Sequence, residues 1–158
     1  MSSTKKKIQE VSQLYSSGNF QKAKQNALKF LKKYPQDTVM LNLLAITYGA
    51  LGETKEAENC FLQIIKIDEK DVAAYNNLGL LYFEEYNFER SRAMHENALR
   101  LDPSMHALYT NLGNVFLAEE NYEEAEKLYI AGIKLGADTY NAYESLGNLY
   151  MATNSFEK

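Results

Sequence analysis

The fold is decided by the stretch AYNNLGLLYF at residues 74–83, which returns 34 residues later as LYTNLGNVFL at residues 108–117. Glycine recurs in the same register at Gly79, Gly113 and Gly147. The tyrosine and leucine residues around Gly79 are spaced by three, four and seven positions, which is the apolar stripe of an amphipathic helix. A fixed period of this length is typical of a stack of short helical units.

The whole chain follows this period from residue 4 onward. We predict one domain at residues 1–158, whose repeats are 4–37, 38–71, 72–105, 106–139 and an incomplete 140–158. Pro35 and Pro103 fall at the same point of the frame and predict the ends of second helices, because proline disfavours helical conformation in the preceding residue. Lys7 and Glu10 stand where apolar residues are expected, so the first repeat is interpreted as a polar terminal cap.

Two columns of the frame predict how the helices pack. One holds leucine at residues 44, 78, 112 and 146, and the other holds the small residues Ala23, Ala57, Ser91 and Ala125. Large residues beside small ones let two helices approach closely. Glycine in the middle of a helix costs roughly 1 kcal/mol relative to alanine. Its recurrence in this frame therefore predicts a tight helix crossing.

These motifs resemble those of tetratricopeptide repeat proteins. The first-helix pattern Y-x2-L-G-x2-[YF] occurs at residues 75–82 and 109–116, and the second-helix pattern A-x3-[FY] at residues 57–61 and 125–129. The resemblance covers residues 4–158 and implies an all-α, right-handed superhelical solenoid of antiparallel helix pairs with about nine helices. The Asn-Leu-Gly and Leu-Gly-Asn strings further resemble the repeats of the O-linked N-acetylglucosamine transferase.

Composition excludes several classes of protein. No run of about 18 apolar residues is present for a membrane span, and no apolar block of the signal-peptide kind follows Lys5, Lys6 and Lys7. We therefore expect a cytoplasmic protein with no membrane partner. A lone Cys60 cannot build a disulfide framework, and two histidines with one cysteine argue against a structural zinc site.

No catalytic constellation is present in the sequence. It lacks a Walker loop, G-x-G-x-x-G, H-E-x-x-H and C-x-x-C. His95 falls in the column of Phe61 and Tyr129, which predicts a packed core histidine, and Cys60 is interpreted as a half-buried small hydrophobe. The glutamate clusters are interpreted as a solvated face. We predict that the chain is not an enzyme and holds no cofactor and no metal.

Charge is divided unevenly along the chain. Residues 1–37 hold eight lysines and two acidic residues, whereas residues 38–158 hold nine basic and nineteen acidic residues. A basic first repeat suggests nucleic acid or acidic lipid, but without interleaved aromatic residues a solvated cap is favoured and no nucleic-acid partner is expected. Repeats of heat-shock co-chaperones hold a terminal carboxylate with lysine and arginine, where this chain has Ile8, Ser12, Leu43, Ala73 and Asn77. This difference argues against a chaperone-tail receptor.

The resemblance implies that the first helices line a concave groove. The predicted groove residues are Asn42, Ile46, Asn76, Asn77, Leu80, Phe83, Asn111, Asn114, Leu117, Asn148 and Met151. A carboxamide offers both donors and an acceptor to the backbone of an extended peptide. Helices about 10 Å apart correspond to about three residues of extended chain. An asparagine ladder gripping a partner segment is one hypothesis, and asparagines that are merely solvated are the other.

The function predicted is a protein–protein interaction scaffold that binds an extended or helical segment of a protein partner. Two alternatives stay open: the N-terminal recruiting module of a larger glycosyltransferase-like enzyme, and a small stand-alone secretion-type chaperone. Residues 155–158 are expected to open a further helix, so a fragment of a longer protein is favoured. Part of the cover of Tyr143, Leu146, Leu149 and Tyr150 would then be missing, which invites self-association.

Overall fold

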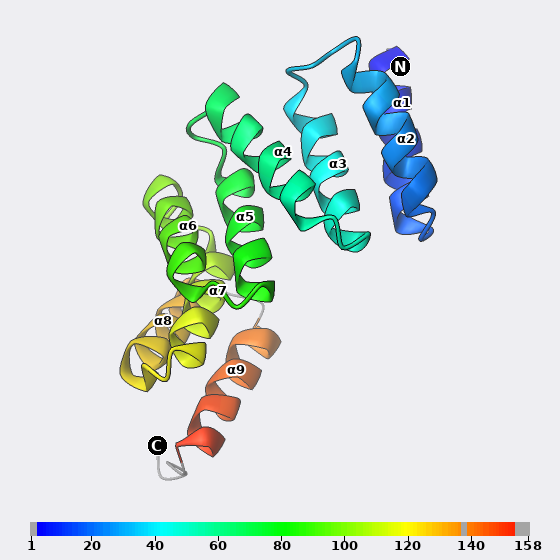
Figure 1. Cartoon of the computed structure of the whole chain (residues 1–158). Coiled ribbons are helices and arrows are strands. Elements are labelled where there is room, and N and C mark those ends of the chain that lie inside the picture. The colour runs from blue at the N-terminus through cyan, green and yellow to red at the C-terminus, as the bar shows by residue number, and fades with distance from the viewer. Residues whose placement is uncertain (1–2, 137–138, 154–158) are drawn as a thin grey trace. The chain divides into compact units, whose positions relative to one another are not determined.

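A computed structural model describes residues 3–136 and 139–153, and all regular elements in these two ranges are α-helices (Figure 1). The nine helices of the described ranges are α1 (Ser3–Ser16), α2 (Phe20–Leu31), α3 (Thr38–Ala50), α4 (Thr54–Ile67), α5 (Val72–Glu84), α6 (Phe88–Leu101), α7 (His106–Ala118), α8 (Tyr122–Lys134) and α9 (Thr139–Ala152). The predicted all-α fold of antiparallel helix pairs is confirmed. The predicted start of a tenth helix at residues 155–158 lies outside the described residues.

The chain forms two compact units, Met1–Ala74 and Tyr75–Lys158. In the first unit α1 packs on α2, α2 on α3 and α3 on α4. In the second unit α6 packs on α7, α7 on α8 and α8 on α9, so that neighbours in sequence are neighbours in space. The first residues of α3, α5 and α7 are spaced at the 34-residue period of the sequence.

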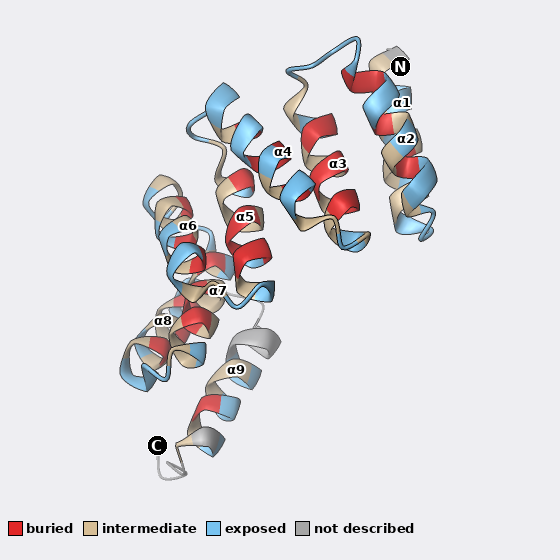
Figure 2. Ribbon diagram, viewed as in Figure 1, coloured by how far each residue is buried: buried red, intermediate tan, exposed pale blue. Residues whose placement is uncertain are grey.

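The core of each unit follows the predicted columns of large and small residues. In Figure 2 the turns are mainly exposed, and buried residues form stripes along the helices. The small column, Ala23, Ala57, Ser91 and Ala125, is completely buried. Because these residues project little beyond the backbone, each second helix can lie close to its neighbours.

The glycine column is where an aromatic ring of the second helix lies against the first helix. A Cβ added to Gly113 would come 2.5 Å from Cε1 of Tyr129, and one added to Gly79 would come 2.7 Å from Cε1 of His95. The buried Ser91 hydroxyl also donates to the Gly79 carbonyl oxygen over 2.8 Å. The predicted tight crossing is therefore present in the third and fourth repeats. At Gly147 nothing lies within 4 Å of an added Cβ.

A second regular contact joins one repeat to the next. At three of the small-column positions, the next residue in sequence touches the aromatic residue of the following first helix. Lys24 places its amine 5.1 Å from the ring centre of Tyr48, and Arg92 lies 5.8 Å from that of Phe116. In the last such contact the Tyr150 hydroxyl donates to Oε1 of Glu126 over 2.7 Å. Charged groups thus join the first repeat to the second, the third to the fourth and the fourth to the fifth, by cation–π contact or hydrogen bond.

The turn inside each repeat uses a left-handed residue. The position is glycine in the first two repeats, with φ of +75° at Gly18 and +73° at Gly52, but Tyr86 and Glu120 adopt φ of 59° in the next two. Backbone N–H groups beyond the turn return to the last helical turn, as where Asn121 N donates to Phe116 O over 2.8 Å. This hydrogen-bonded helix end fixes the angle at which the second helix begins.

Replacing the crossing glycine tests the close approach of the helices. Gly113→Ala should lower the free energy of unfolding by about 1–3 kcal/mol, because the buried Tyr129 ring must move away from the new Cβ. Gly147→Ala is the matched control and should raise stability by about 1 kcal/mol, since alanine favours a helix and meets no neighbour there. Urea denaturation followed by circular dichroism measures both. Equal effects of the two substitutions would contradict the crossing.

Candidate functional site

The predicted groove residues lie on first helices of both units. Asn42 and Ile46 are on α3 in the first unit. The others are in the second unit: Asn76, Asn77, Leu80 and Phe83 on α5, Asn111, Asn114 and Leu117 on α7, and Asn148 and Met151 on α9. All eleven side chains have some solvent exposure, from half-buried asparagines to Met151, which is 58% exposed.

The structure brings together Asn76 and Asn111. Nδ2 of Asn111 donates to Oδ1 of Asn76 over 2.8 Å, so the carboxamides of two successive first helices form one pair. The sequence frame instead aligned Asn77 with Asn111, because it compares residues 34 apart, and the hydrogen bond joins residues 35 apart. The pair still has the Nδ2 donors of Asn76 and the Oδ1 acceptor of Asn111 to offer a peptide backbone.

Asn114 has a partner that the sequence did not indicate. The hydroxyl of Tyr129 donates to Oδ1 of Asn114 over 2.8 Å. Tyr129 is completely buried, and burial raises its pKa to about 12, so the hydroxyl stays protonated at neutral pH and keeps this bond. Asn114 therefore holds the ring on Gly113, and its Nδ2 group remains as donor. The sequence did contain a signal for this hydrogen bond. In the third repeat Leu80 stands at the position of Asn114 and His95 at the position of Tyr129, so the two hydrogen-bonding residues are replaced together.

The apolar members of the set divide between core and surface. Phe83 packs on Phe88 with ring centres 5.5 Å apart, and Leu117 packs against the cluster of Ala125, Tyr129 and Leu149. Leu80 is 38% exposed and Met151 58%. In the second unit these two are therefore the predicted apolar residues that present most surface to a ligand.

The outer face of α9 is only partly as expected. Tyr143 is 56% exposed. Leu149, by contrast, is 2% exposed because it packs against Ala125 and Tyr129 of α8, and Leu146 and Tyr150 are partly buried against the same cluster.

Groups able to do chemistry lie outside the groove set. Cys60 is buried, and desolvation raises its pKa to about 11, so the thiol is protonated and unreactive at neutral pH. His95 is 1% exposed, as predicted for a core histidine, and neither ring nitrogen has a hydrogen-bond partner. In the described ranges no three His, Cys, Asp or Glu side chains are placed to share a metal ion. Nor is any helix there long and apolar enough to cross a bilayer.

His95 should make stability depend on pH. Burial lowers its pKa from 6.5 to about 4, so as pH falls below 6.5 the unfolded chain takes up a proton that the folded chain refuses. Stability should fall by about 3 kcal/mol between pH 7 and pH 4 on this account. His95→Phe should remove that part of the loss, since Phe61 occupies the same column. Urea denaturation from pH 7 to pH 4 compares the two proteins, and parallel stability curves would contradict the assignment.

Antiparallel helix pairs that repeat every 34 residues, with an aromatic ring on a first-helix glycine, define a tetratricopeptide repeat protein. The chain belongs to the family described as "Psidin, N-terminal TPR repeats region", which matches residues 5–136. This fold generally mediates protein–protein interaction and is typically a non-catalytic scaffold. No curated protein matches the chain significantly.

Solved structures agree on the fold. MamA is 23% identical, with a TM-score of 0.79 over 91% of this chain and 84% of that one. PilF of Pseudomonas aeruginosa is 20% identical, with a TM-score of 0.85 over 95% and 68%. The first TPR of Spaghetti (RPAP3), solved bound to the HSP90 peptide SRMEEVD, is 23% identical, with a TM-score of 0.70 over 76% and 95%. At these identities the likeness extends to the fold alone.

Proposed function

We propose that this chain is a scaffold that binds an extended or helical segment of a protein partner along its first helices. The observation that carries the proposal is the carboxamide pair of Asn76 and Asn111, 2.8 Å apart on adjacent first helices. The pair offers backbone-type donors and an acceptor from two successive repeats, so it can bind a peptide main chain whatever its side chains. The exposed Leu80 supplies an apolar contact on the same helix as Asn76.

The chemistry of these helices favours an uncharged segment. The neighbour solved with the HSP90 peptide SRMEEVD supports peptide binding by this fold. In this chain, however, α5, α7 and α9 contain no lysine or arginine. An acidic tail would find no counter-charge on them, and burying a carboxylate without one is costly. Recognition through main-chain hydrogen bonds and apolar side chains is therefore the mode we propose.

The two alternative functions, a recruiting module of a larger enzyme and a stand-alone chaperone, remain predictions, because membership of the family does not distinguish between them. A glycosyltransferase-type recruiting module rests on the Asn-Leu-Gly and Leu-Gly-Asn strings, and the comparisons support only the tetratricopeptide family. A small secretion-type chaperone would have to keep a client soluble that is insoluble alone. Sequencing the reading frame beyond Lys158 separates the two, because a catalytic region must follow in the first case.

Removing the carboxamide pair tests the proposed function. Peptides selected from a displayed random library on the wild-type protein serve as probes, and fluorescence anisotropy gives their affinities. Asn76→Ala with Asn111→Ala should weaken binding at least about tenfold, because two or more hydrogen bonds to the peptide main chain are lost. The fold should persist, since both partners of the bond are removed together.

The matched control is Asn59→Ala with Asn97→Ala, which removes two carboxamides from the second helices α4 and α6. It should leave affinity within about twofold of wild type, a difference of about 0.4 kcal/mol. Unchanged binding by the first pair, with an unchanged helical spectrum, would refute the carboxamide role. Equal losses in both pairs would do the same.

A further inference from the structure

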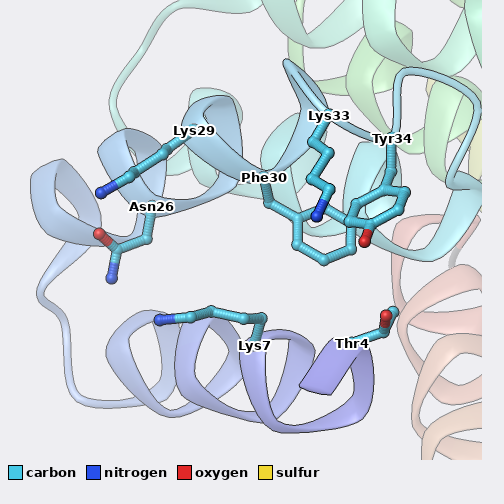
Figure 3. A pocket seen from close by; sticks show the side chains of 7 residues that line it. All are labelled: Thr4, Lys7, Asn26, Lys29, Phe30, Lys33 and Tyr34. Atoms are coloured by element: carbon cyan, nitrogen blue, oxygen red, sulfur yellow. The ribbon is translucent and has the colours of Figure 1, made fainter. Parts of the chain in front are cut away.

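A cleft lies between α1 and the C-terminal part of α2 in the first unit (Figure 3). Its volume is about 270 Å³, near the lower end of the ~300–1,000 Å³ typical of ligand pockets. Its lining comes from Thr4 and Lys7 on α1, Asn26, Lys29 and Phe30 on α2, and Lys33 and Tyr34 in the turn after α2. No residue of the predicted groove takes part in it.

One of the residues that line the cleft is a lysine at a position where the later repeats have a large apolar residue. Lys7 occupies the column of Leu41, Tyr75 and Tyr109. In the fourth repeat Cβ of Tyr109 would lie 3.2 Å from a Cβ added to Gly132, whose column holds Phe30 in the first repeat. In the first repeat the amine of Lys7 turns instead to Oε2 of Glu10, 2.7 Å away. The cleft is thus lined by Lys7 and Phe30, where the fourth repeat has Tyr109 and Gly132 in the same columns.

The cleft carries an excess of positive charge. Glu10 is already engaged, because it accepts from Lys7 and, over 2.9 Å, from Nδ2 of Asn26. Among the residues that the structure describes, neither Lys29 nor Lys33 has an ion pair with a carboxylate. Three lysines thus line a cleft edged by one carboxylate, which leaves two cations for an acidic ligand.

The aromatic residues narrow the class of ligand. Phe30 is 8% exposed and Tyr34 is 42% exposed, with ring centres 4.9 Å apart. The amine of Lys33 lies 5.3 Å from the centre of the Tyr34 ring. Because Phe30 and Lys33 already occupy the surroundings of this ring, it is a poor platform for the base stacking that single-stranded nucleic acid needs. The rings instead form an apolar wall.

The positions of the amines also argue against a single compact anion. Figure 3 shows Lys29 and Lys33 spread along the second helix and its turn, with Phe30 between them in sequence. A phosphate group is held best by donors that converge on one point. Separated cations around an apolar wall instead fit a peptide whose carboxylates flank an apolar side chain.

We propose that this cleft binds an acidic segment of a partner protein. An apolar side chain of that segment enters between α1 and α2 against Phe30, and carboxylates on either side pair with Lys29 and Lys33. A terminal cap needs only solvated residues on its outer face. That requirement does not account for a cavity with more lysines than acids. The site shares no residue with the carboxamide pair. It gives the scaffold a second ligand that is acidic, whereas the segment proposed for the first helices is uncharged.

The test uses the whole chain and a short fluorescein-labelled peptide in which one leucine is flanked on both sides by glutamates. Anisotropy at physiological ionic strength should show saturable binding to the wild type. Lys29→Glu with Lys33→Glu should weaken it at least about tenfold. The control, Lys6→Glu with Lys32→Glu, changes net charge equally at exposed lysines outside the cleft and should stay within about twofold, or about 0.4 kcal/mol.

Each other outcome overturns the proposal. Failure of the wild type to bind, equal binding by both variants, or equal loss in both would each do so. Wild-type protein that binds phosphatidylserine vesicles or single-stranded DNA but not the peptide would do so as well. If charge reversal alters the helical spectrum, Lys29→Gln with Lys33→Gln gives the same readout. The Asn76→Ala, Asn111→Ala protein must bind the acidic peptide as wild type does, which separates failure of this site from failure of the groove.

Discussion

The contact of an aromatic ring with a bare helix backbone is the constraint on which the second unit depends. Tyr129 can lie on α7 only because Gly113 has no Cβ. Its hydroxyl then reaches Asn114, and its ring supplies the surface on which Leu149 of α9 is buried. Glycine lowers the stability of the helix that contains it, but its missing Cβ allows three helices to share one core.

The fold and the candidate site were not equally predictable from the sequence. Helix positions and the buried small column follow from periodicity, because each residue there packs against its own repeat or the next. The pairing of Asn76 with Asn111 did not, since stacked helices are offset and the partner lies one residue away from the aligned position. The cleft beside Lys7 also escaped prediction. In the sequence, a lysine at a core position indicates a solvated side chain, and the cleft that it lines is seen only once the helices are packed.

The surface proposed for binding is partly held by the fold itself. Asn114 orients Tyr129, Asn111 orients Asn76, and Leu117 packs against the core cluster of α8 and α9. Side chains already fixed by such contacts lose little conformational freedom when a ligand arrives, which favours affinity. The price is that a substitution here acts on stability and binding together, so paired removal of both hydrogen-bonding partners is more informative than a single change.

The contacts that join the third, fourth and fifth repeats differ from one junction to the next. Arg92 and Glu126 occupy the same column with opposite charge, and each suits the ring that follows it: the guanidinium lies over Phe116, and the carboxylate accepts from the hydroxyl of Tyr150. A duplicated fourth repeat would set Glu126 against Phe116, a ring with no hydroxyl to donate and an electron-rich face that disfavours an anion. The charge of the residue after the small column thus favours the native order of the third, fourth and fifth repeats.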